Sequence, residues 1–264
     1  MSNGPSRGWD FPPANEDVEE IESRTHSAES LARQGSYLPA AAQVNPARRL
    51  VDTLLTLPAL DLQSGAHTKY VASQTYVTAG NIWRQIAANN YLENREMAAP
   101  LDQLDEADRL LRIAVRTGQQ ALMGTAFASE ETRRRAELQY GYAELKLAQA
   151  GLARVIMQRD RPALAAARTH LAAARTRFEE WGDAVGYVDS RTLDELMRYY
   201  SFTRPISGFT ARTFGTIRSL WRDIQRVAPR DPQHVNAARR LAARRIRLLF
   251  VPRQAAERAI LLDY

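Results

Sequence analysis

The sequence predicts an all-α protein built from antiparallel helical hairpins, which form either a bundle or a short superhelical stack. Apolar and small residues recur at spacings of three and four, as on one face of an α-helix. Proline and glycine lie between these stretches, where helices are expected to begin and end. No window alternates apolar and polar residues between hairpin turns, as a β-strand would.

Residues 1–45 are predicted to form an extended, flexible N-terminal arm, followed by a helical-hairpin domain over residues 46–264. Prolines and glycines interrupt the arm, and its apolar residues are too few to offset the entropy of ordering it. A short helix near Ser27–Arg33 is the one exception expected. Residues 1–30 carry seven acidic side chains against two arginines. We therefore expect the arm to become ordered by docking on neighbouring subunits.

Start and stop signals predict three hairpins, at about residues 67–118, 130–182 and 208–250. Ser129 and Asp160 are expected to cap the two helices of the middle hairpin. Before the first hairpin, Asn45-Pro46 matches an N-cap followed by proline at the first helical position, which predicts a short helix to about residue 57.

The packing pattern is clearest in the middle hairpin, where only residues 159–161 separate two helices that each carry one stripe of apolar and small residues. So short a connection forces the helices to be antiparallel, and the small residues predict that their backbones approach closely. The two stripes consist of Leu138, Gly141, Leu145, Ala148, Leu152 and Val155, and of Leu164, Ala167, Leu171, Ala174, Phe178 and Trp181.

This hairpin resembles a tetratricopeptide-type helix pair over about residues 130–182. The residues that carry the resemblance are Tyr142, Ala143, Leu145, Ala148 and Gly151, then Ala163, Ala167, Leu171, Ala174 and Phe178. The resemblance implies a stacked superhelix that binds partners on its surfaces. The helices are longer than those of that family and its 34-residue period is absent, so no binding residues are transferred.

Two further patterns are weaker. Ile82-Trp83-Arg84-Gln85-Ile86 is similar to Leu220-Trp221-Arg222-Asp223-Ile224, which is explained either by an internal repeat of hairpins or by chance. Thr192-Leu193-Asp194-Glu195 has the spacing of a capping box, which marks helix starts.

Motifs for catalysis are lacking in the sequence. There is no cysteine, the four histidines are far apart, and no Gly-rich phosphate loop or Gly-x-Ser-x-Gly turn is present. We therefore predict a non-enzymatic protein without catalytic residues, cofactor or metal, and keep an all-α enzyme without recognisable motifs as an alternative. No apolar run could span a bilayer and no signal peptide is evident. A location in the cytoplasm or within a phage or virus particle is expected.

Arginines in the last third of the chain are the candidate functional residues. Residues 198–258 carry 14 arginines against three acids. Arg240, Arg244 and Arg247 share one face of a predicted helix. Arg244 or Arg245 meets the apolar face of that helix, where an arginine must either extend its charged group to solvent or find an acidic partner. The candidate contact residues are Arg239, Arg240, Arg244, Arg245, Arg247 and Arg253.

Three interpretations of these arginines remain open: a solvated helix, contact with an acidic protein surface such as the arm of a neighbouring copy, or non-specific nucleic-acid binding. The favoured hypothesis is a structural or adaptor subunit of a larger bacterial or phage assembly. Its partners would be other protein subunits, including further copies of itself.

Overall fold

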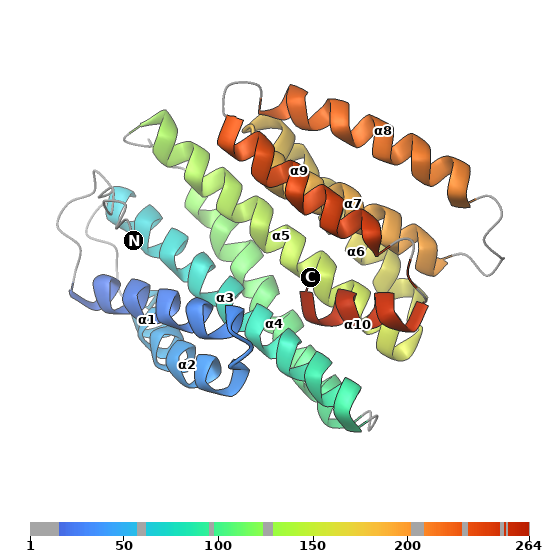
Figure 1. The fold of residues 1–264 in the computed structure, drawn as a ribbon. Coiled ribbons are helices and arrows are strands. Elements are labelled where there is room, and N and C mark those ends of the chain that lie inside the picture. Colours follow the sequence, from blue (N-terminus) through green and yellow to red (C-terminus); the bar gives the residue numbers. More distant parts are fainter. Residues whose placement is uncertain are drawn as a thin grey trace.

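The computed structural model describes residues 16–56, 62–94, 98–123, 129–201, 209–228, 232–248, 251 and 253–263, which contain ten α-helices and no strand (Figure 1). The helices are α1 Glu16–Arg33, α2 Tyr37–Leu54, α3 Leu62–Asn94, α4 Ala98–Leu122, α5 Glu130–Gln158, α6 Arg161–Glu180, α7 Ala184–Ser201, α8 Phe209–Val227, α9 Pro232–Arg247 and α10 Arg253–Asp263. The all-α prediction is confirmed. None of the helices in these ranges has the length and apolar character that crossing a membrane requires.

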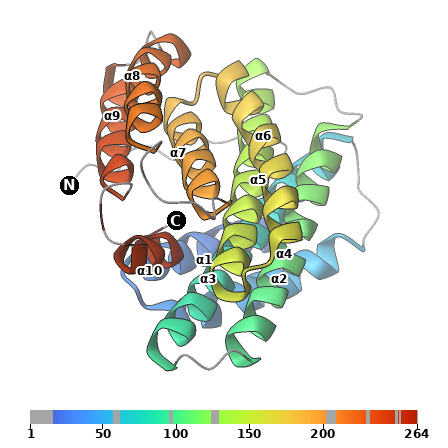
Figure 2. The same ribbon diagram turned by 90° about the vertical axis from the view of Figure 1, so that its right-hand side faces the viewer.

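The helices form a two-layer stack of antiparallel pairs. The pairs α1–α2, α3–α4 and α5–α6 follow one another, and α7, α8 and α9 complete the stack at the end opposite α1 and α2 (Figure 1). Helices α1, α3, α5 and α7 lie side by side in one layer. Helix α10 returns to pack on α3 and α5, well away from α8 (Figure 2).

The first two predicted hairpins are confirmed as α3–α4 and α5–α6, while the third differs in its packing. Its two helices form close to the predicted positions, as α8 and α9. However, α9 contacts α7 more extensively than it contacts α8. The start and stop signals in the sequence therefore predicted α8 and α9 as helices. The short connection between them does not make α8 the main packing partner of α9.

The prediction of an extended arm is wrong for residues 16–45, which form α1 and most of α2; residues 1–15 lie outside the described part of the chain. The few apolar residues of α1 are spaced along one face, and they pack with those of α2 against α3 in one core cluster. The entropy of ordering this segment is offset by burial against its own domain. The buried residues of α1 are Val18, Ile21, Thr25, Ala28 and Ala32.

Residues that suggested irregular structure are accommodated within this N-terminal hairpin. Gly35 adopts φ 79° after α1, and the amide of Ser36 donates to the Leu31 carbonyl at 3.0 Å, a Schellman turn that reverses the chain. Pro39 occupies the first turn of α2, where a missing N–H costs nothing. Pro46 lies inside α2 rather than at a helix start, so the predicted cap at Asn45 is also wrong.

The middle hairpin follows its prediction closely. The Ser129 hydroxyl accepts from the Thr132 amide at 3.1 Å, and an Asp160 carboxylate oxygen accepts from the Ala163 amide at 3.2 Å. Between the helices, a Cβ built on Gly151 would lie 2.7 Å from the Ala167 Cβ. The small residues therefore permit the close backbone approach that the sequence predicts.

Helix α7 has a different start from the one suggested by the capping-box spacing. Thr192 lies inside the helix, and its hydroxyl donates to the carbonyl of Val188 at 2.9 Å. The cap is Asp183, whose Oδ1 accepts from the amides of Val185 and Gly186 at 3.0 Å each. A Thr-x-x-Glu pattern inside a helix has the spacing of a capping box, but the backbone amides there are bonded within the helix and need no cap.

Two glycine-to-alanine substitutions test the close packing. Gly151→Ala should destabilise the protein by about 1–3 kcal/mol, because the new methyl group meets the Ala167 Cβ, which cannot rotate away. Gly215→Ala in α8 should instead stabilise it by about 0.5–1 kcal/mol, because nothing lies within 4 Å of the added Cβ. Urea unfolding followed by circular dichroism measures both; equal stabilisation by the two substitutions would contradict the packing.

Candidate interaction surface and buried charged centre

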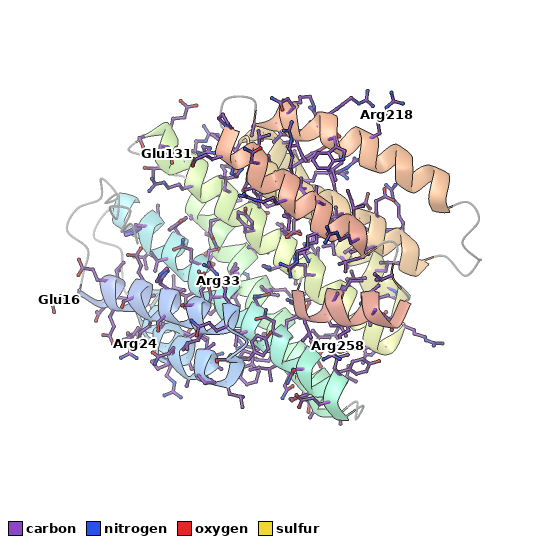
Figure 3. All side chains as sticks on the ribbon, viewed as in Figure 1. Glu16, Arg24, Arg33, Glu131, Arg218 and Arg258 are labelled. Carbon is purple, nitrogen blue, oxygen red and sulfur yellow. The ribbon has the colours of Figure 1, made fainter. Side chains whose placement is uncertain are left out.

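Helices α8 and α9 together carry nine arginines against one acidic residue, Asp223. Arg240, Arg244 and Arg247 lie on the exposed side of α9, opposite the residues that α9 buries. We call the exposed set the arginine surface: Arg218, Arg222, Arg239, Arg240, Arg244 and Arg247. Arg218 projects from the edge of the molecule at α8 (Figure 3).

Two contacts define how this surface is built. Arg239 donates from Nη2 to Gln225 Oε1 at 3.0 Å, which joins the two helices. Trp221 is 38% exposed and lies one helical turn from both Arg218 and Gln225. An exposed aromatic ring beside arginines is the composition typical of protein interfaces.

Arg245 does not belong to this surface, although the sequence made it a candidate contact residue. It is 6% exposed, and its Nε lies 3.1 Å from Asp189 Oδ1 on α7. This is the acidic partner that an arginine on the apolar face of α9 requires. Arg253 begins α10, and its side chain lies outside the described residues.

Arg245 and Asp189 form part of a group of ionisable side chains that the sequence did not reveal. We call it the charged centre: Arg84 on α3, Lys146 on α5, Asp189 on α7 and Arg245 on α9. Burial lowers the pKa of Lys146 to about 8, and the positive charges of Arg84 and Arg245 act in the same direction. Burial likewise lowers the pKa of Arg84 to about 10.

Arg84 is 1% exposed and connects the centre to the C-terminal helix. Its Nη1 donates to the Leu261 carbonyl at 2.9 Å, while Nε and Nη2 donate to Asn81 Oδ1 at 3.3 and 3.1 Å. Leu261 lies in the last turn of α10, whose carbonyls lack helical donors and attract cations. The sequence analysis did not predict α10; the buried residues Ala256 and Ile260, spaced four apart, are a signal that could have indicated it.

A second polar group joins α5, α7 and α9. Asp183 Oδ2 accepts from the Tyr142 hydroxyl at 2.6 Å, and Asp183 Oδ1 lies 3.0 Å from His234 Nε2. Burial alone would raise the pKa of Asp183, but the hydrogen bonds from His234 and Tyr142 outweigh it and lower that pKa. Within the described ranges, no three histidine or carboxylate side chains are placed to hold a metal ion.

Comparison with protein-family models gives no match, and searches of curated proteins and of solved structures likewise match nothing. The resemblance of residues 130–182 to tetratricopeptide hairpins therefore stays a prediction.

Asp189→Ala should destabilise the protein by about 2–4 kcal/mol, because it leaves the buried Arg245 cation without this carboxylate. Arg240→Ala is the control and should change stability by less than about 0.5 kcal/mol, because Arg240 is exposed. Denaturant midpoints measure both changes. A loss no larger for Asp189→Ala than for the control would exclude a structural role for the ion pair.

Asp183→Asn should make the protein less stable at neutral pH and less sensitive to acid. Because the folded-state pKa of Asp183 is lowered, its contribution is present above the unfolded value of about 3.9 and is lost as the pH falls through the folded value. The stability gap between wild type and variant should therefore be full at pH 7 and narrow as the pH falls below about 3.9, as measured by urea unfolding. A gap that stayed constant would contradict this assignment.

Proposed function

We propose that the protein is a non-enzymatic structural subunit of a larger assembly, in which the arginine surface of one copy binds the acidic α1 of the next. The observation that carries the proposal is that the acidic α1 and the arginine-rich α8 and α9 lie at opposite ends of the helical stack (Figure 1). The proposed setting is the cytoplasm or a phage or virus particle.

The acidic end is helix α1, which carries six acidic residues against Arg24 and Arg33. Glu16 and Glu19 are exposed at its first turn. Glu16 lies on the side of the molecule away from Arg218 (Figure 3). Glu20 and Glu29 are engaged within the helix by Arg24 and Arg33. The first turn is therefore the part of α1 that presents negative charge outward.

The basic end supplies the complementary features. Arg218, Arg222, Arg240 and Arg247 are exposed and have no ion-pair partner among the described residues. Complementary charge increases the association rate of such a contact and fixes how the two surfaces align. Trp221 supplies an apolar anchor. Because the two patches are different surfaces of one chain, the contact is head-to-tail and produces rings or filaments.

Nucleic acid is the second candidate for the arginine surface. The specific observation in its favour is the exposed Trp221 among arginines, because stacking on aromatic rings and contacts to phosphate together bind single strands. The first proposal is preferred because the acidic α1 provides a complementary surface within the same chain.

Charge reversal tests the assembly. Light-scattering mass should show self-association of the wild type at about 50 mM salt that weakens at about 500 mM, as screening requires. Arg240→Glu/Arg247→Glu should weaken association about tenfold or more, and so should Glu16→Arg/Glu19→Arg. Mixing the two variants should restore association, because each reversed end then meets an oppositely charged end.

The matched control is Arg49→Glu/Arg116→Glu, which makes the same charge change at exposed sites on α2 and α4 and should associate like the wild type. A wild type that stays monomeric at low salt would refute the assembly. A monomer whose mass increases only when DNA is added would establish nucleic acid as the ligand of the arginine surface.

A further inference from the structure

Helix α10 does not continue the stack after α9 but packs on two helices from much earlier in the chain. It lies against α3 and α5, whereas the described residues of α10 do not approach the backbones of α8 or α9 in this way (Figure 2). Residues 248–252 connect α9 to α10, a length of chain that spans at most about 20 Å. The last helix is therefore joined by a short connection to one part of the stack and docked on another.

Three buried residues hold α10 on this face. Ala256 and Ile260 lie one turn apart on the same side of the helix, and Leu261 follows Ile260. Ala256 and Ile260 belong to the core cluster shared by α5 to α9, whereas Leu261 belongs to the cluster formed with α3, α4 and α5. The apolar side of α10 therefore covers the seam where two core clusters meet.

Arg84 binds the end of the docked helix. Its Nη1 donates to the Leu261 carbonyl at 2.9 Å, and Asn81 Oδ1 holds the same guanidinium from within α3. The carbonyls in the last turn of a helix have no helical donor and carry partial negative charge. The face beneath α10 thus combines apolar burial with a donor for a helix C-terminus, which fixes the direction in which a bound helix lies.

These contacts do not require α10 to belong to the same copy of the chain. The buried side chains and the carbonyl are carried by α10 itself, so the α10 of a second copy presents an identical surface. With 11 residues, α10 is shorter than the roughly 12–15 residues that an isolated helix needs in water, so it depends on a docking face for its stability. Exchange of an identical element across a short hinge is a low-cost route to dimers.

We infer that the face of α3 and α5 beneath α10 is a helix-binding site, and that two copies of the chain exchange α10 across it. In a single copy the site holds its own α10. In a dimer it holds the α10 of the second copy, with the same buried residues and the same bond to Arg84. Mass action favours the exchanged form as protein concentration rises. The contact uses neither the arginine surface nor the first turn of α1, so it does not rest on the proposed head-to-tail assembly.

Complementation between two full-length variants tests the exchange, at about 500 mM salt so that contacts between exposed charges are screened. Ile260→Asp/Leu261→Asp should undock α10 and leave the α3–α5 face intact, because two carboxylates cannot be buried there. Arg84→Glu should keep α10 intact but remove the donor for its carbonyl. Light-scattering mass should show association about tenfold stronger in the equimolar mixture than in either variant alone, because only the mixture pairs an intact α10 with an intact face. A mixture no more associated than its components would overturn the inference.

A labelled synthetic peptide of residues 251–264 gives a second measurement. It should bind the Ile260→Asp/Leu261→Asp variant about tenfold more tightly than the wild type, because the wild-type site is already filled by its own α10 at high effective concentration. Equal binding to both chains, or binding to neither, would contradict a site beneath α10. If the variant does not fold, as judged by circular dichroism, the wild type is titrated with the peptide and with its Ile260→Asp form. The inference then fails if the two peptides bind alike.

Two control variants separate this site from the other surfaces. Ala255→Asp/Arg258→Asp adds two carboxylates on the exposed side of α10 and should bind the peptide like the wild type. Arg240→Glu/Arg247→Glu, which disrupts the arginine surface, should also bind it like the wild type. Loss of peptide binding in the second control would place the contact on the arginine surface and rule out the face of α3 and α5.

Discussion

The architecture has to supply hydrogen-bond acceptors to the buried Arg84 guanidinium, because a buried cation is tolerated only when its N–H groups are satisfied. Asn81 Oδ1 accepts from Nε and Nη2 within α3, and the Leu261 carbonyl of α10 accepts from Nη1. A stack of helical hairpins ordinarily contacts only its sequence neighbours. Here the C-terminal helix is drawn back across the stack to α3, and the Arg245–Asp189 pair attaches α9 to α7 in the same region.

Small residues make this arrangement geometrically feasible. Gly151 and Ala167 allow α5 and α6 to approach closely, and Gly186 faces the Phe178 ring in the same way where α7 follows α6. Close pairs of helices are stiff, because a packed interior responds to displacement as a solid does. Polar side chains placed between such pairs are held at fixed separations, which explains how charges from four helices stay gathered at one point.

Features of the fold that local interactions determine could be predicted from the sequence. Features that depend on contacts between distant residues could not. Ser129 and Asp160 identified helix starts because a cap acts within one turn. Residues 16–45 were misjudged because the apolar residues that order them are supplied by α3. Arg240, Arg244 and Arg247 could be placed on one face from their spacing. The burial of Arg84 could not be predicted, because Arg222 occupies the same position in the similar segment on α8 and is exposed. The two arginines differ because α10 covers α3, whereas α8 lies at the end of the stack.

The bond between Arg84 and Leu261 also has a consequence for biosynthesis. Its two residues are 177 positions apart, so Arg84 leaves the ribosome long before its acceptor exists. At about 5–20 residues per second, this delay is roughly 10–35 s, far longer than the microseconds in which helices form. Until Leu261 is synthesised, Arg84 must therefore stay hydrated on the surface of the α3–α4 pair. Completion of the core is timed by the progress of translation and not by the speed of folding.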